Sequence, residues 1–117
     1  MYNLPTGKVI MFFKWFKVKR KVFVFFQECL VESCNDSNVS LYASCWIYFN
    51  SKELSANLVE FYLAQEGFKI KEIIFPVQKV YHSDYNSEQK KILQYHNEAL
   101  KTGYSLVFHP TPMSPFK

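Results

Sequence analysis

Glycine and proline are scarce in this chain, with 3 Gly and 5 Pro among 117 residues. So little glycine argues against the standard Gly-rich loops that cradle phosphate groups. The three cysteines and three histidines follow no Cys-x-x-Cys or other compact ligand spacing, so we expect no metal centre. The sequence carries no strong catalytic signature. We therefore predict a protein that is not an enzyme and has no cofactor.

Long hydrophobic runs are also missing. No stretch approaches the roughly 20 apolar residues of a membrane-spanning helix. The apolar runs 9–13 and 22–26 are too short, or too soon followed by polar residues, for an export signal. The odd number of cysteines, Cys29, Cys34 and Cys45, leaves at least one thiol unpaired within a single chain, which favours a reducing compartment. We expect a cytoplasmic protein.

Acidic residues are absent from the first 26 residues, whereas residues 27–117 hold 8 Lys against 10 acids. The net charge of +4 therefore belongs to the N-terminal part. A basic arm on a nearly neutral body suits an anionic partner such as nucleic acid or a lipid surface. Lysines at a strand edge would equally discourage aggregation of an aromatic segment. The candidate contact residues are Lys14, Lys17, Lys19, Arg20 and Lys21.

Aromatic residues are abundant, at 19% of the chain, and hydrophobic residues make up 49%, which is enough for a packed core. The length suits one domain. We divide the chain into a basic aromatic N-terminal arm or edge strand (1–21), a single α+β domain (22–109) and a Pro-containing tail (110–117). In that tail, Pro112, Pro115 and Lys117 have the spacing of an SH3-type ligand, a pattern that is common by chance.

Strict alternation of apolar residues over Val39–Phe49 predicts a strand, joined to an apolar run over Val22–Val31 by a hairpin. A turn centred near Ser37 would place Cys29 and Cys45 opposite each other, close enough for a disulfide under oxidation.

Two helices are predicted by similar signals. For the first, Asn50 and Glu53 resemble a capping box and Gly67 a stop, with an apolar face of Leu54, Leu58, Phe61 and Tyr62. For the second, Asn86 and Gln89 mark the start and Gly103 the stop, with an apolar face of Ile92, Leu93, His96, Ala99 and Leu100.

Strand character returns over Ile70–Tyr81, where Pro76 requires an edge or a bulge, and over Tyr104–Phe108. The order β-β-α-β-α-β, with a further N-terminal strand over Val9–Val18 as an option, predicts an α+β two-layer sandwich. We expect a mixed sheet with both helices on one face, related in topology to ferredoxin-like architectures.

If the odd residues of 39–49 pack beneath the helices, the even ones place Tyr42, Trp46 and Tyr48 on the opposite sheet face. Tyrosine and tryptophan are favoured at protein contacts, so we predict that these three bind a protein partner or a second copy of the chain. Burial of the rings under the N-terminal segment is a further option. The alternative function is a nucleic-acid-binding module in which the rings stack bases and the basic arm holds phosphates.

A third hypothesis is a small enzyme using His82 and Asp84, because a carboxylate beside an imidazole fixes its tautomer. This hypothesis requires both groups to line one pocket. The stronger interpretation is that these residues cap or close the loop.

Overall fold

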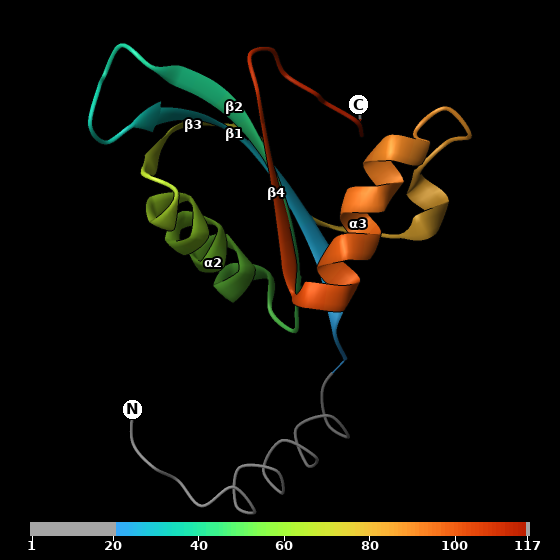
Figure 1. The fold of residues 1–117 in the computed structure, drawn as a ribbon. Helices are drawn as coiled ribbons and strands as arrows, with labels where there is room; N and C mark the ends of the chain where they lie inside the picture. Colours follow the sequence, from blue (N-terminus) through green and yellow to red (C-terminus); the bar gives the residue numbers. More distant parts are fainter. Residues whose placement is uncertain (1–20, 117) are drawn as a thin grey trace, which may run out of the picture.

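A computed structural model describes residues 21–116, so the further strand considered over Val9–Val18 lies outside the described residues. Within residues 21–116, four strands form one sheet: β1 (Phe23–Ser33), β2 (Ser40–Phe49), β3 (Phe68–Val80) and β4 (Tyr104–His109). The same range contains two helices, α2 (Lys52–Gln65) and α3 (Lys90–Thr102), and a 3₁₀ turn, η1 (His82–Asp84). The predicted α+β class, the packing of helix on sheet and the element order are confirmed (Figure 1).

The sheet has the order β3-β1-β2-β4 and every pair of neighbours is antiparallel. The prediction of a mixed sheet is therefore wrong. The reason is that the β1–β2 hairpin occupies the centre: the connection through α2 passes over β1, so β3 runs parallel to β2 without being its neighbour.

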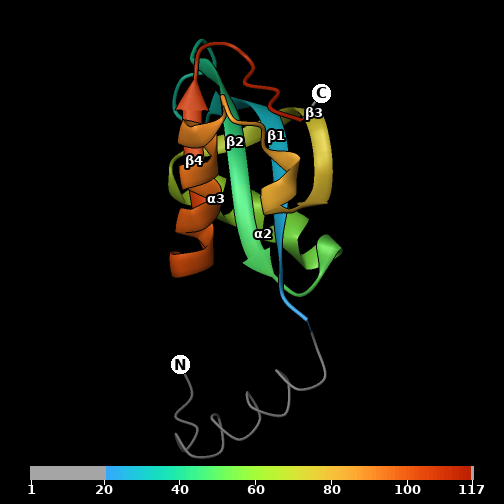
Figure 2. The same cartoon turned by 90° about the vertical axis from the view of Figure 1, so that its right-hand side faces the viewer.

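The two helices lie on opposite faces of the sheet, as the two views show (Figures 1 and 2). Val59 and Leu63 of α2 pack on one set of strand residues, whereas Ala99 of α3 packs with Trp46 on the other face. The prediction that both helices share one face is wrong, and the ferredoxin-like likeness does not extend to this packing. Both faces of β1 and β2 are consequently buried, from Val24 to Cys29 on one strand and from Ala43 to Ile47 on the other.

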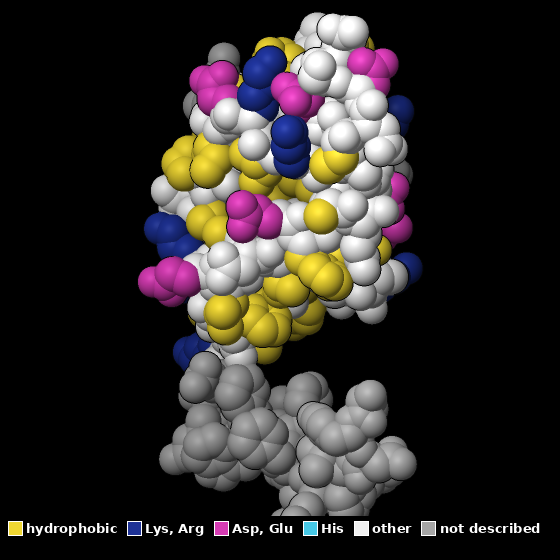
Figure 3. All heavy atoms as spheres, turned by 90° about the vertical axis from the view of Figure 1, so that its left-hand side faces the viewer, with side chains coloured by type: hydrophobic (Ala, Val, Ile, Leu, Met, Phe, Trp, Pro, Cys, Tyr) yellow, Lys and Arg dark blue, Asp and Glu magenta, His cyan; other side chains and the backbone are white. Residues whose placement is uncertain are grey.

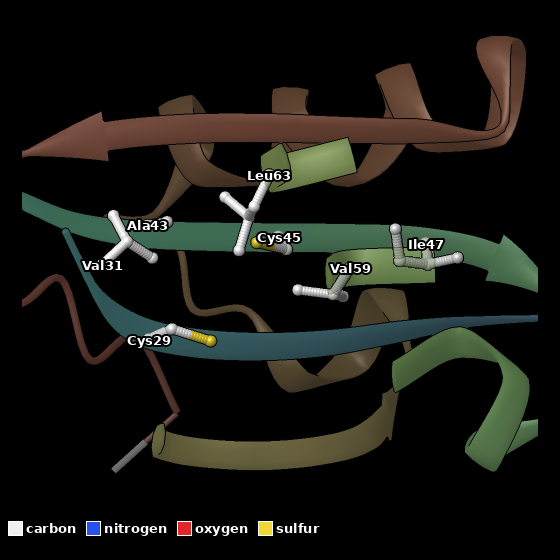
Figure 4. Close-up of a cluster of buried hydrophobic side chains, with 7 residues drawn as sticks. All are labelled: Cys29, Val31, Ala43, Cys45, Ile47, Val59 and Leu63. Atoms are coloured by element: carbon white, nitrogen blue, oxygen red, sulfur yellow. The ribbon is translucent and has the colours of Figure 1, made fainter. Parts of the chain in front are cut away.

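The core under α2 consists of alternating side chains from the hairpin and two from the helix (Figure 4). Its fully buried members are Cys29, Val31, Ala43, Cys45, Ile47, Val59 and Leu63. The helix turns this face to the sheet after an N-cap at Ser51, whose hydroxyl accepts a hydrogen bond from the backbone N–H of Leu54. The cap was predicted one residue earlier, at Asn50. Gly67 and Gly103 follow the two helices with φ of +88° and +101°, as the stop signals predicted.

Pro76 lies in edge strand β3, where the pairing with β1 shifts register between Phe26↔Gln78 and Glu28↔Phe75. An edge position and a bulge both relieve the loss of the proline N–H, so this prediction is confirmed.

The thiols differ sharply in environment. Cys29 pairs with Ala43 across the hairpin and Cys45 with Gln27, so the two cysteines are not directly opposite, and all three thiols are free. Burial, followed by the nearby Glu28 and Glu60 carboxylates, raises the pKa of Cys29 to about 12, and burial raises the pKa of Cys45 well above its usual value.

In the native protein we expect one fast-reacting thiol, Cys34, which is exposed in the turn between β1 and β2. The thiolate is the reactive form, and burial denies it to the other two cysteines. Ellman's reagent should titrate one equivalent per chain before denaturant and three after it. Fast titration of two or more equivalents in native buffer would contradict the packing of Figure 4.

Candidate interaction surfaces

The aromatic face of the sheet, which was predicted to bind a partner, is covered by the protein's own helix α3. Trp46 is fully buried. Its ring lies 4.9 Å from that of Phe26 and 5.4 Å from that of Tyr95 on α3, measured between centroids. The prediction that Trp46 is exposed to a partner is therefore wrong, because α3 covers the sheet face on which the partner was expected to bind.

The three candidate residues do not form one surface. Tyr42 is half-buried at the His109 end of β4, and Tyr48 is 36% exposed beside the start of β1. Trp46, between them on the same face, separates the two tyrosines. Of the three, Tyr48 is the most exposed.

A chain of hydrogen bonds fixes the groups beneath α3. The Trp46 indole donates to the Tyr85 hydroxyl at 3.0 Å, and that hydroxyl lies 2.8 Å from Nδ1 of His96. Because an indole N–H can only donate, the Tyr85 oxygen accepts from it, and the Tyr85 O–H donates to Nδ1 of His96 in the tautomer that carries its hydrogen on Nε2. Burial, then the charge of His82, lowers the pKa of His96 to about 4, so the imidazole is neutral at pH 7.

The His82–Asp84 pair does not form. The Asp84 carboxylate accepts from the backbone N–H of Tyr81 at 2.8 Å, while Nε2 of His82 lies 2.8 Å from Oδ1 of Asn97. The His82 ring instead lies near that of His96, with centroids 4.7 Å apart and the ring planes tilted by 44°. Within residues 21–116 no three His, Cys, Asp or Glu side chains are grouped as metal ligands.

A buried carboxylate on β1 holds the C-terminal tail. Glu28 is fully buried, and its two oxygens accept the backbone N–H groups of Met113 at 2.6 Å and Ser114 at 2.9 Å. Two charge-assisted hydrogen bonds satisfy a group that would otherwise be costly to bury. Sequence reasoning missed this pair, although a lone acid within the apolar run of β1 was its signal.

The tail continues into an aromatic cleft. The Phe116 ring lies 4.9 Å from that of Phe26, 5.2 Å from Tyr85 and 6.2 Å from Phe75. The Gln89 amide donates to the carbonyl of Pro115 at 2.9 Å. The tail was predicted to be an ordinary extended segment whose prolines have the spacing of an SH3-type ligand; it is instead half-buried against its own domain from Met113 to Phe116.

An open apolar groove lies between one side of α2 and the end of β2. Leu54 is 49% exposed and Phe61 54% exposed, although the sequence placed both on the core-facing stripe. Together with Phe49, Asn57 and Leu58 they line a hollow of about 330 Å³. Figure 3 shows hydrophobic side chains exposed on this side of the molecule, with charged side chains among them. Single exposed apolar residues are ordinary, but a grouped set marks an interaction surface.

Of the predicted cationic contacts, Lys21 is described and exposed, whereas Lys14, Lys17, Lys19 and Arg20 lie outside the described residues. No helix within residues 21–116 has both the length and the apolar character to cross a bilayer. Comparison with known protein families, curated proteins and solved structures finds no match to this chain.

Proposed function

We propose that this protein is a non-enzymatic interaction module of the cytoplasm that associates with a second copy of itself through the groove on α2. The observation that carries the proposal is the joint exposure of Leu54 and Phe61 beside a hollow that is lined almost wholly by apolar side chains. Three unpaired thiols support the reducing compartment.

The charges beside the groove favour a basic occupant. Helix α2 exposes Glu53 and Glu60 against the single cation Lys52. A segment that carries both apolar and cationic side chains would complement this surface, since charge complementarity selects partners and speeds their encounter.

The chain itself contains such a segment. Residues 14–21 interleave five cations with Trp15, Phe16 and Val18. A second copy therefore supplies the chemistry that the groove requires. Covering the exposed half of a ring such as Phe61 would contribute about 1 kcal/mol from apolar burial.

Replacing Phe61 with aspartate is expected to convert the associated protein into monomer, because it places a charge at the centre of the apolar groove and adds to its acidity. Light scattering coupled to gel filtration measures the mass. The matched control is Ile73→Asp, since Ile73 is 51% exposed on edge strand β3 and lies outside the groove. A wild-type protein that is monomeric at every concentration, or equal dissociation by both variants, argues against the proposal.

Nucleic-acid binding is the competing outcome. The described domain bears 8 Lys against 10 acids, and its buried Trp46 has no face free to stack a base. Binding would therefore rest on the basic arm and would weaken steeply with salt, with a slope near −0.7 per neutralised phosphate on single strands. Such salt-dependent binding to mixed oligonucleotides, together with a monomeric mass, would favour this function over self-association.

A further inference from the structure

Residues 113–116 lie in the cleft around Glu28 in the way that a bound peptide lies in its binding site. Two consecutive backbone N–H groups meet one buried carboxylate, and the next carbonyl accepts from Gln89. The following side chain, Phe116, enters a pocket of aromatic rings. Backbone hydrogen bonds with a side-chain anchor are the usual elements of peptide recognition.

The connection to this bound segment is short and loosely held. Residues 110–112, Pro-Thr-Pro, are exposed and form no hydrogen bond within residues 21–116. Ser114 has φ of +43°, a left-handed conformation that a residue other than glycine adopts at a cost. Strong contacts at one end and strain within the segment indicate that the chain is held in place by the cleft, since its own conformational preference opposes the geometry.

We propose that this cleft is a peptide-binding site, filled in the monomer by the chain's own residues 113–116 and open to the same segment of a second copy when the tail is released. A second copy is the partner that fits this cleft, because exchange of residues 113–116 between two chains reproduces every contact of the tail in trans. The intramolecular segment has the advantage of a high effective concentration, so it excludes the outside segment until it is displaced. This site lies across the sheet from α2 and is independent of the proposed groove.

The test uses full-length chain with Ser114 replaced by proline, and a labelled peptide of residues 111–117 with the natural sequence. Ser114→Pro removes one N–H donor to Glu28 and forbids a positive φ, so it releases the tail without altering any residue of the cleft. Fluorescence anisotropy measures peptide binding. We expect the variant to bind at least about tenfold more tightly than the wild-type chain, and a Phe116→Ala peptide to bind at least about tenfold more weakly, from the lost burial of one ring.

Thr111→Ala is the matched control, since Thr111 is exposed on the connecting segment, and it should bind the peptide as weakly as the wild type. A folded Ser114→Pro chain that binds neither peptide, or both equally, overturns the proposal. Phe116→Ala in the full chain provides a second opened cleft if Ser114→Pro does not fold. Failure of both variants to fold would show that the tail is an integral part of the core and would overturn the proposal as well. These peptide-binding results do not depend on the mass of the Phe61→Asp variant. The cleft proposal and the self-association proposal can therefore fail separately.

Discussion

Trp46→Asp is expected to unfold the domain and not merely to release a partner. Trp46 is fully buried between Phe26 and Tyr95, and its indole donates to Tyr85. Truncation of a buried tryptophan alone costs about 3–5 kcal/mol, and an unpaired carboxylate in the same place adds to it. The total approaches the entire stability of about 5–15 kcal/mol that an ordinary domain possesses. Circular dichroism and thermal unfolding measure the loss.

Tyr48→Asp is the matched control for this experiment. Tyr48 lies two residues further along β2 on the same face but is 36% exposed, so aspartate there should cost about 1 kcal/mol or less. Trp46→Phe separates packing from hydrogen bonding, because it keeps a ring and loses the donor to Tyr85. A Trp46→Asp protein with the wild-type melting temperature would be incompatible with the burial described above.

Stability is expected to fall as the pH drops from about 6.5 to about 4, and His96 supplies a large part of the loss. Its pKa is lowered from 6.5 to about 4 by burial, then by the charge of His82, while Asp84 opposes the shift. Between these two values the unfolded chain binds a proton that the folded chain does not, so acid favours unfolding. At 1.36 kcal/mol per pKa unit the loss amounts to about 3 kcal/mol.

Chemical denaturation at a series of pH values measures this dependence, and the reference is His96→Gln, which cannot titrate. The variant should lack the slope that His96 contributes and should keep the slope of the other titrating groups, including His109, whose pKa is also lowered by burial. The histidine ring signals in NMR give a direct readout: His96 should remain neutral at pH 5. Identical slopes in wild type and His96→Gln would exclude His96 as the cause.

The elements themselves were predictable because they are local. The alternation of 39–49 predicted β2, and glycines at 67 and 103 ended both helices where a left-handed residue is required. Pro76 predicted an edge or a bulge and lies at both. Each of these signals acts over a few residues, so no knowledge of the distant chain was needed.

The surfaces were not predictable in the same way, because exposure depends on what lies opposite. The even positions of β2 are aromatic or small and polar, a pattern equally typical of an open face and of one covered by a helix. The consecutive apolar run Phe23–Phe26 in the neighbouring strand was the stronger indication that both faces are buried.

Helix α2 shows the same limit. Its apolar residues lie on more than one face of the helix, and their spacing alone does not predict which face packs against the sheet. In the fold, Ser55, Val59 and Leu63 are buried, while Leu54 and Phe61 are turned to the side. The residues that the pattern assigned to the core thus became the candidate interaction surface.

The bond between Glu28 and the tail joins residues 85 and 86 positions apart. In a chain that lacks residues 113–116, the two carboxylate oxygens of Glu28 lose their backbone donors, and the surrounding aromatic rings lose their contact with Phe116. A buried acid without hydrogen-bond donors is costly, and newly exposed aromatic rings favour aggregation of partly folded chains. A chain shortened at residue 112 is therefore expected to be less stable and more prone to aggregate than the full chain.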